Sequence, residues 1–445
     1  MKPANLLLQI LLGLLLTVPP NLPAQPVPHH FDGIAALPDR TITLSLGGSV
    51  SNMFSLSGAI SNQFMQMFDL YAVEASTNLA EWTRLALLLR TNNNPHPLLF
   101  QDTNAAGLGE RFYRTFTNHL LTAFPKPSGP FAVGMVDRVM IDPARTNLYR
   151  YTPATNAFMV TFWYPADPPA AGVLPAAMWD QRIAADTGIY SYAGYDTRWA
   201  WITPKLVGHR FRGLLLAAGA GKCPVVLYSH GLPAWRKLVS RTAEELASHG
   251  YVVVTVDHTD CWATEFPDGR YLVGNRSGDV PGRLKDMTFL VDELAVLNTG
   301  DPLFADRLDL DRIGIYGGSM GGMVVETCRS DNRVKCALLY DATNIQSLCP
   351  AGLQKPFLVA LGESNYFYSE DVGLFNKATT NAVFLQIRGA DHMTPCDAGW
   401  TAEIPQGRRP ALAFDDCSVW FFDTYLKGEA PPFPTNPEIY NVQRK

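Results

Sequence analysis

A short glycine-rich segment in the last third of the chain constrains the fold most strongly. Residues 317–321 read Gly-Gly-Ser-Met-Gly; they follow the strand-like run 312–316 and precede a helix-compatible run from Met323. A serine on a sharp strand-to-helix turn needs glycines beside it, because side chains would clash there. The helix that begins behind the serine also favours negative charge developing next to it. The segment therefore predicts a nucleophile elbow with Ser319 as the nucleophile; the alternative is a chance glycine turn.

Strand-like and helix-like segments alternate around this elbow. The run 251–256 is almost entirely β-branched, which is typical of a strand buried on both faces of a parallel sheet. Other strands are expected at 158–164, 224–228, 312–316, 337–340, 357–361 and 382–387, and helices at about 236–249, 281–298, from 320, and 411–426. This alternation predicts a mostly parallel sheet covered by helices on both faces. Together with the elbow it predicts an α/β-hydrolase fold.

A histidine downstream of the elbow is the expected general base. An activated serine needs a base, and the base needs an orienting acid, in the chain order Ser, acid, His for this fold. His392 is the one histidine after Ser319, and it follows the strand that ends at Ile387. The sequence therefore predicts His392 as the base. His230 and His258 end upstream strands, so they are candidates for lining the site.

The acid has more than one candidate. Asp341 directly follows Leu-Leu-Tyr at a strand's carboxyl end, where sites in open α/β sheets gather. Glu363 and Asp371 follow the next strand, and Asp391 adjoins the histidine. We expect Asp341 to be the acid, with Glu363 as the alternative.

The oxyanion hole needs backbone N–H donors near the nucleophile. One donor should be Met320, directly after the serine. The other should come from the loop 229–233, which follows an apolar strand and contains Gly231. The sequence predicts Leu232 as this second donor; the alternative is an ordinary glycine turn.

The first residues resemble a targeting segment. Lys2 precedes an apolar run from Leu6 to Val18, and a small residue, Ala24, follows at a plausible cleavage point. A run of about 13 residues is short of the ~20 that a helix needs to cross a bilayer. We therefore expect residues 1–24 to be a secretory signal peptide and the mature chain to be secreted, periplasmic or on the cell surface, rather than anchored by a transmembrane segment.

Two domains are expected after this segment. Residues 33–118 alternate short apolar runs with turn residues, which predicts a small β-sandwich-like accessory module. This module is interpreted as structural or adhesive, with contacts to a surface or polymer. A Pro/Gly-rich joint at 125–130 separates it from the catalytic domain, residues 126–445.

Composition and cysteine content narrow the function further. The 445-residue chain has a formal net charge of −5 and no basic run, which argues against a nucleic-acid partner. No cysteine pair has zinc-finger spacing, and the proposed chemistry requires neither a metal nor an organic cofactor. The seven cysteines allow disulfides after export, and Cys349–Cys396 is the first pairing to consider because the loops carrying acid and base should converge. Cys328–Cys336 is a second pairing, and buried free thiols are the alternative.

Several segments outside the elbow carry a resemblance to a known family. They are 127–134, 162–165, 229–236, 246–250, 256–260 and 387–392. Together these segments resemble the plasma and type II intracellular platelet-activating-factor acetylhydrolases, over residues of about 127 to 427. The resemblance implies a calcium-independent serine esterase with Ser319, Asp341 and His392 as triad and Leu232 and Met320 as oxyanion donors. One departure is Gly318, since the family usually has histidine before the nucleophile.

The sequence therefore predicts an exported serine esterase or lipase that forms an acyl-enzyme from short-chain acyl or phospholipid-type esters. The aromatic stretch 189–201 has no clear counterpart in the family, and with Trp262 it would equally suit polyester (cutinase-like), lipid or plant esters. A peptidase or an acyltransferase would also fit the same triad, and a non-catalytic binding protein could reuse the same fold.

Overall fold

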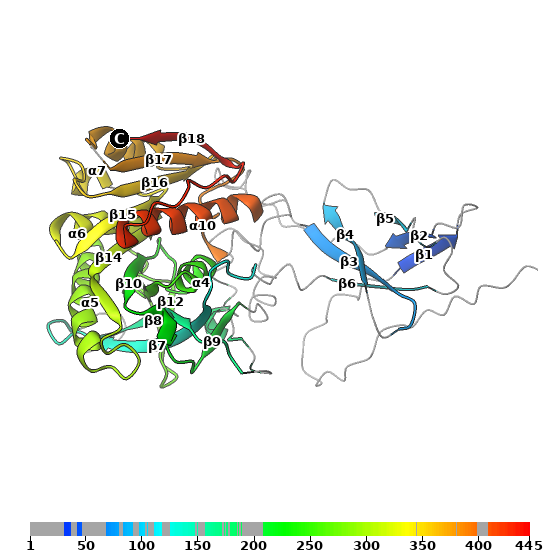
Figure 1. Ribbon diagram of the computed structural model, residues 1–445, viewed down its shortest axis with the longest axis horizontal. Coiled ribbons are helices and arrows are strands. Elements are labelled where there is room, and N and C mark those ends of the chain that lie inside the picture. The colour runs from blue at the N-terminus through cyan, green and yellow to red at the C-terminus, as the bar shows by residue number, and fades with distance from the viewer. Residues whose placement is uncertain are drawn as a thin grey trace, which may run out of the picture. The chain divides into compact units, whose positions relative to one another are not determined.

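Figure 1 shows the computed structural model of the protein, in which the chain forms two compact units, Met1–Leu121 and Thr122–Lys445. The structure describes residues 31–36, 42–46, 68–79, 83–91, 98–102, 105, 111–117, 125–146, 149, 156–170, 173, 175–176, 179–184, 186, 188, 208–343, 345–379, 381–397 and 408–445. The expected signal peptide, 1–24, and the aromatic stretch 189–201 lie outside the described residues.

The amino-terminal unit contains two three-stranded antiparallel sheets, with orders β1-β2-β5 and β4-β3-β6. Their strands are β1 Phe31–Ala36, β2 Ile42–Leu46, β3 Phe68–Ser76, β4 Thr83–Thr91, β5 Leu98–Asp102 and β6 Phe112–Thr117. Asp102 is buried and accepts hydrogen bonds from Arg111 Nε at 2.6 Å and from the Tyr113 hydroxyl at 3.0 Å. This contact ties the end of β5 to β6. The sandwich-like description of the module stays a prediction.

The carboxyl-terminal unit is built on one ten-stranded sheet. Its strands are β7 Ala132–Ile141, β8 Ala157–Ala166, β9 Arg210–Arg212, β10 Cys223–Ser229, β11 Val252–Val256, β14 Leu308–Gly318, β15 Val334–Tyr340, β16 Phe357–Gly362, β17 Ala382–Ile387 and β18 Ile439–Arg444. A short hairpin, β12 Ala263–Glu265 and β13 Tyr271–Val273, lies outside this sheet.

Several helices lie between the strands in the part of this unit that the structure describes. They are α1 Gln181–Ala184, η4 Ala218–Ala220, α4 Ser240–Ser248, α5 Val280–Gly300, η5 Ser319–Val324, α6 Val325–Ser330, α7 Ile345–Leu348, α8 Tyr368–Lys377, α10 Arg408–Phe422 and η6 Asp423–Lys427. The Asp279 side chain caps α5 by accepting from Gly282 N–H at 2.9 Å, which satisfies one of the open donors of the first turn. Gly250, at φ 95°, follows α4 and ends it, as a glycine commonly does after a helix.

The central part of the sheet is parallel. The strand order is β18-β17-β16-β15-β14-β10-β11-β8-β7-β9, and the six strands from β17 to β11 pair in parallel. Pairings β11–β8, β8–β7 and β17–β18 are antiparallel. Because the carboxyl ends of the parallel strands meet at one edge, the loops after β10, β14 and β15 converge there.

Two apolar cores lie on opposite faces of this sheet, since alternate residues of β10 belong to different cores. Val225 and Leu227 pack with residues of α5, α6 and α8, whereas Val226 and Tyr228 pack with residues of α4 and α10. Figure 1 shows α5 and α10 as long helices beside the sheet. The predicted α/β-hydrolase fold, a mostly parallel sheet covered by helices on both faces, is confirmed.

The structure differs from the expected elements at the elbow and at the sheet ends. Residues 319–324 form a 3₁₀ turn and an α-helix begins only at Val325, because Gly321 and Gly322 disfavour α-helix at its start. Strands β7 and β18 were not expected from the sequence, although both belong to the main sheet. Within the part of the chain that the structure describes, no helix is long and apolar enough to cross a membrane.

Candidate active site

Ser319 occupies a tight turn directly after β14. Its φ is 54°, in the left-handed region that most residues avoid. A Cβ on Gly317 would lie 2.2 Å from the Gly321 carbonyl oxygen, and one on Gly321 would lie 2.0 Å from the Ser229 carbonyl oxygen. Glycine is therefore required on both sides of the serine for the turn to form, as the elbow motif predicts.

Asp341 and His392 form a direct pair at the same edge of the sheet. Asp341 follows β15 and is fully buried, and its Oδ2 lies 2.5 Å from Nδ1 of His392. The carboxylate also accepts backbone N–H groups of Tyr366, at 3.0 and 3.1 Å, and of Phe367, at 2.8 Å. These donors stabilise the ionised carboxylate and fix its orientation. With Nδ1–H donated to Asp341, the neutral imidazole keeps Nε2 as a proton acceptor.

Ser319 and His392 line one small cavity of about 40 Å³. Its other lining residues are Tyr228, Tyr316, Gly318, Tyr340, Met393, Pro395 and Cys396. Tyr366 stands beside this cavity, with its ring centroid 4.9 Å from that of His392 and half of its surface exposed. The site thus combines a buried carboxylate, a partly exposed imidazole and a half-buried serine.

The two expected oxyanion residues lie close to each other and to the serine. A Cβ on Gly231 would lie 3.2 Å from Ser319 Cβ, so the loop after β10 approaches the nucleophile. A Cβ on Gly278 would meet Met320 Cε at 2.6 Å and Leu232 Cδ2 at 3.6 Å. The segment around Gly278 therefore packs against the side chains of both residues, a contact that nothing in the sequence indicated.

The other carboxylates considered for the acid have different partners. Glu363 Oε2 accepts from Gly389 N–H at 2.9 Å, and Asp391 Oδ1 accepts from Met393 N–H at 2.9 Å. Asp371 accepts from Ala342 N–H at 2.9 Å, and burial, with Asp341 nearby, raises its pKa well above the usual value for a carboxyl. Of these groups, the structure brings Asp341 into hydrogen-bond contact with His392.

A second chain of serine, histidine and aspartate lies next to the first but is fully buried. His258 Nδ1 lies 2.7 Å from Asp286 Oδ2, and His258 Nε2 lies 2.9 Å from Ser229 Oγ. Ser229 pairs with Gly317 across β10 and β14, so this chain lies one strand away from the elbow. Histidines 230 and 258 were expected only to line the site. Instead both are buried beneath it.

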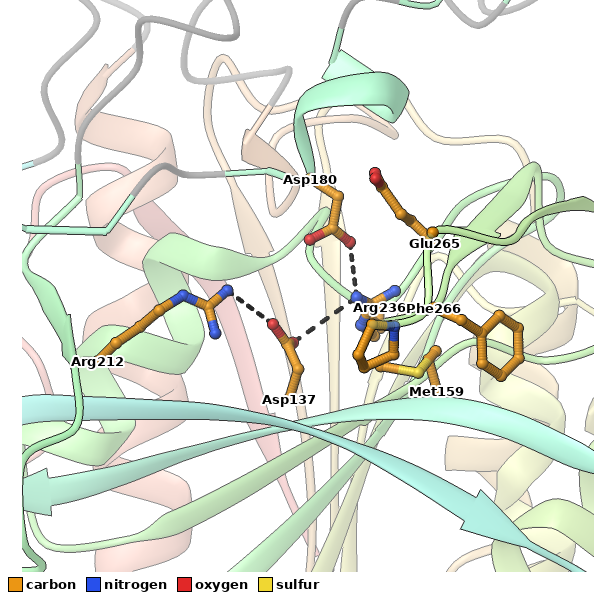
Figure 2. A pocket seen from close by; sticks show the side chains of 9 residues that line it. Asp137, Met159, Asp180, Arg212, Arg236, Glu265 and Phe266 are labelled. Atoms are coloured by element: carbon orange, nitrogen blue, oxygen red, sulfur yellow. Dashed lines mark hydrogen bonds and ion pairs between the residues drawn. The ribbon is translucent and has the colours of Figure 1, made fainter.

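A larger cavity of about 470 Å³ lies at the β7 end of the sheet (Figure 2). Arg236 donates to Asp180 at 2.6 Å, and Lys237 donates to Asp137 at 3.0 Å. Burial alone would raise the pKa of Asp137. The nearby cations Lys237, Arg236 and Arg212 outweigh this effect, so the pKa of Asp137 lies below its usual value. Figure 2 shows the side chains of Asp137, Asp180, Arg212 and Arg236 directed toward one another. The described residues that line this cavity include three carboxylates, Asp137, Asp180 and Glu265, but no serine, cysteine or histidine.

The two cysteine pairings proposed from the sequence are wrong in this structure, where all seven cysteines are free. Cys349 belongs to the core on the α5 face, whereas Cys396 packs with the cluster around Trp179. Cys328 and Cys336 belong to the two cores on opposite faces of the sheet. The loops carrying acid and base do converge, but their cysteines point into different cores.

The fold and the tight serine turn place the chain among the α/β-hydrolases. The family model described as platelet-activating factor acetylhydrolase, isoform II, matches residues 116–268, a range that includes Leu232 but ends before Ser319. The chain is similar to the platelet-activating factor acetylhydrolases of Cavia porcellus, 25% identical over 49% of this chain and 55% of that protein, and Canis lupus familiaris, 24% identical over 56% and 63%. The predicted resemblance to this family is confirmed, at low identity.

Two further relatives carry esterase names. A probable 1-alkyl-2-acetylglycerophosphocholine esterase of Arthroderma benhamiae is 25% identical over 49% of this chain and 58% of that protein. The solved structure of a ferulic acid esterase from Streptomyces cinnamoneus is 25% identical, with a TM-score of 0.60, and covers 72% of this chain and 98% of that one. The chain spans little more than half the length of these curated relatives. Their activity is therefore only proposed for this chain.

Proposed function

We propose that the protein is a serine hydrolase of carboxylic esters, with Ser319 as nucleophile, His392 as general base and Asp341 as orienting acid. The observation that carries this proposal is the pairing of His392 Nδ1 with the buried Asp341 carboxylate in a cavity that Ser319 also lines. The names of the relatives support ester hydrolysis as the reaction class.

The first half of the reaction acylates the serine. Ser319 Oγ attacks the ester carbonyl while His392 Nε2 takes the hydroxyl proton, and Asp341 stabilises the imidazolium that results. The tetrahedral oxyanion binds the backbone N–H groups of Leu232 and Met320. When the carbon–oxygen bond breaks, His392 returns the proton to the departing alcohol and an acyl-serine remains.

The second half repeats these roles with water. His392 Nε2 takes a proton from the water that attacks the acyl carbonyl, and the same two N–H groups bind the second oxyanion. Collapse of this intermediate releases the carboxylic acid, and His392 returns its proton to Ser319 Oγ. Every proton taken is returned, so the enzyme ends in its starting state.

The substrate we propose is an ester with a short acyl group, as in acetylated phospholipids. The cavity beside Ser319 is small, about 40 Å³, and three tyrosines line it. An acetyl group fits such a space better than a long chain does. A second candidate is an aromatic plant ester, favoured by the ferulic acid esterase match and by the exposed Tyr366 ring beside His392.

Export and the amino-terminal unit complete the proposal. Residues 1–24 would direct secretion and be removed near Ala24. The two small sheets that follow would contact a surface or a polymer and hold the hydrolase near its substrate.

The test is a substrate panel on the purified chain beside its Ser319→Ala variant. We expect p-nitrophenyl acetate to be hydrolysed faster than the butyrate and octanoate esters, with little turnover of matched anilides. The alanine variant should lose this activity by about 10⁴-fold or more. Methyl ferulate as the best substrate would favour the second candidate, and full turnover by Ser319→Ala would refute the proposed mechanism.

A further inference from the structure

The orientation of one peptide unit decides whether Leu232 can act as an oxyanion donor. In a trans peptide the C=O of one residue and the N–H of the next point in opposite directions on one rigid plane. The Leu232 N–H therefore points away from the direction of the Gly231 C=O. Since Gly231 lies against Ser319, groups that hold this carbonyl also aim the N–H.

The Gly231 carbonyl is held by donors from its own loop. His230 Nδ1 lies 2.6 Å from this oxygen, and Ala234 N–H donates to it at 3.0 Å. An Arg283 nitrogen lies at 3.5 Å, a longer contact with the same oxygen. The Gly231 oxygen thus accepts hydrogen bonds on the side of the peptide opposite to the Leu232 N–H.

The protonation state of His230 is fixed by its surroundings. His230 is fully buried, and its Nε2 accepts the backbone N–H of His258 at 3.1 Å. A nitrogen that accepts carries no proton, so Nδ1 bears the hydrogen that binds Gly231. Burial, with the nearby Arg283 and His258, lowers the pKa of His230 well below its usual value. The ring therefore stays neutral in this tautomer.

Arg283 holds the preceding peptide in the same loop. Its guanidinium, fully buried, donates to the carbonyl of His230 and pairs with Asp260 at 2.8 Å. Asp260 also accepts Asp279 N–H at 2.8 Å, at the start of α5. The loop after β10 is thereby fixed to the helix beneath it, not only to its own turn.

We propose that His230 and Arg283 are positioning residues that hold the Leu232 N–H in the direction of the oxyanion. The inference rests on the proposed function, because it assigns these residues a role in the same reaction. Donors that are oriented before the reaction stabilise a transition state without reorganisation, so loosening them lowers kcat. Neither residue touches the substrate; each acts through the backbone of the loop.

Two replacements of His230 separate positioning from folding. An asparagine places an amide nitrogen near the position of Nδ1 and keeps the donor to Gly231, but it loses the acceptor for His258 N–H. A glutamine places an amide oxygen near the position of Nε2 and keeps that acceptor, but it loses the donor. We expect His230→Gln to fold stably with kcat reduced about 10- to 100-fold and KM within threefold. We expect His230→Asn to melt earlier but to keep kcat within about threefold.

The measurement is kcat and KM for p-nitrophenyl acetate per active site titrated with a fluorophosphonate. It is paired with the inhibition constant of a trifluoromethyl ketone, which forms the same oxyanion. In His230→Gln this constant should rise by the factor that kcat/KM falls. His249→Asn, a partly exposed histidine at the end of α4, is the matched control and should equal the wild type. Arg283→Lys, expected to lose about tenfold in kcat, is the second test if neither His230 variant folds.

Different outcomes separate the two proposals. Wild-type kcat in His230→Gln, or equal kcat losses in the two variants that follow their melting temperatures, would overturn the positioning role. Wild-type kcat in Arg283→Lys would do the same for that residue. If the wild type shows no ester hydrolysis that Ser319→Ala removes, the proposed function fails instead.

Discussion

Two sets of serine, histidine and aspartate lie near each other, and their serines, Ser229 and Ser319, come at the ends of the neighbouring strands β10 and β14. The buried chain, Ser229–His258–Asp286, has complete hydrogen bonds, whereas the open site joins His392 to Asp341 beside Ser319. Ser229 and His258 have no exposed surface, while the His392 side chain is 17% exposed.

From this difference we infer that a hydrogen-bonded set of these three residues does not by itself make a nucleophile. Ser319 follows β14 in a left-handed turn, lines a cavity, and lies close to Gly231 of the loop after β10. Ser229 ends β10 with regular strand pairing, and no substrate can reach its hydroxyl. We infer that access and backbone geometry separate a reactive serine from a structural one. The following predictions test this contrast, from the largest expected effect to the smallest.

Replacing the two histidines should give opposite results. His392→Ala should lose about 10⁴-fold or more in kcat, with a smaller loss of stability than His258→Ala because Asp341 keeps the backbone donors Tyr366 and Phe367. His258→Ala should lose about 2–4 kcal/mol of unfolding free energy, because it leaves Asp286 and Ser229 buried without their partner. Kinetics per titrated site and urea unfolding measure both. A folded His258→Ala enzyme as inactive as His392→Ala would break the contrast.

Replacing Asp341 and Asp286 should show the same contrast between lost activity and lost stability, with smaller effects. Asp341→Asn should lower kcat by about 10³- to 10⁴-fold, because the amide no longer holds the required imidazole tautomer. Asp286→Asn should mainly lower the melting temperature, since Asp286 also accepts from Arg145 at 2.6 Å. Steady-state kinetics and calorimetry distinguish the two effects. Equal kcat losses in both variants would show that the buried chain takes part in the chemistry.

The stability of the protein at low pH should depend on Asp260, which pairs with Arg283 beneath the loop after β10. Burial raises its pKa, but the Arg283 guanidinium outweighs burial and brings it to about 2. An unfolded aspartate titrates near pH 4, so this group contributes about 2 kcal/mol above that pH and loses it as the pH falls toward 2. Asp260→Asn should therefore be less stable at neutral pH and show a flatter stability profile between pH 4 and 2. Urea unfolding at several pH values measures this. The same loss of unfolding free energy between pH 4 and 2 in the variant and the wild type would contradict the prediction.

Treatment with a reducing agent should have the smallest effect on stability and activity. All seven cysteines are free thiols, including Cys396 in the open cavity and Cys349 on the other face. We therefore expect the melting temperature and kcat to be unchanged within error by a phosphine reductant. Thiol titration in denaturant should count seven per chain. A lower count before reduction would show that a disulfide links some of these cysteines.

The parts of the fold that could be predicted are those with local signals. The β-branched run of β11 and the glycines around Ser319 each determine structure within a few residues, so sequence patterns reveal them. The helix after the serine begins later than expected because two glycines delay it. These features depend on backbone sterics and periodicity alone.

The parts that could not be predicted depend on contacts between distant segments. Nothing near Asp341 indicates that Tyr366 and Phe367 N–H groups bind its carboxylate. The cysteine pairings failed for the same reason, since the core that each thiol enters is set by the face of the sheet on which its loop packs. The catalytic roles of Ser319 and His392 stay predictions that only chemistry can test.

The most direct test of the central claim compares the two serines in one experiment. The purified protein is treated with a fluorophosphonate, digested, and mapped by mass spectrometry while residual esterase activity is followed. We expect stoichiometric labelling of Ser319, no labelling of Ser229, and loss of activity in proportion to the label. Labelling of Ser229, or full activity after Ser319 is labelled, would contradict the account.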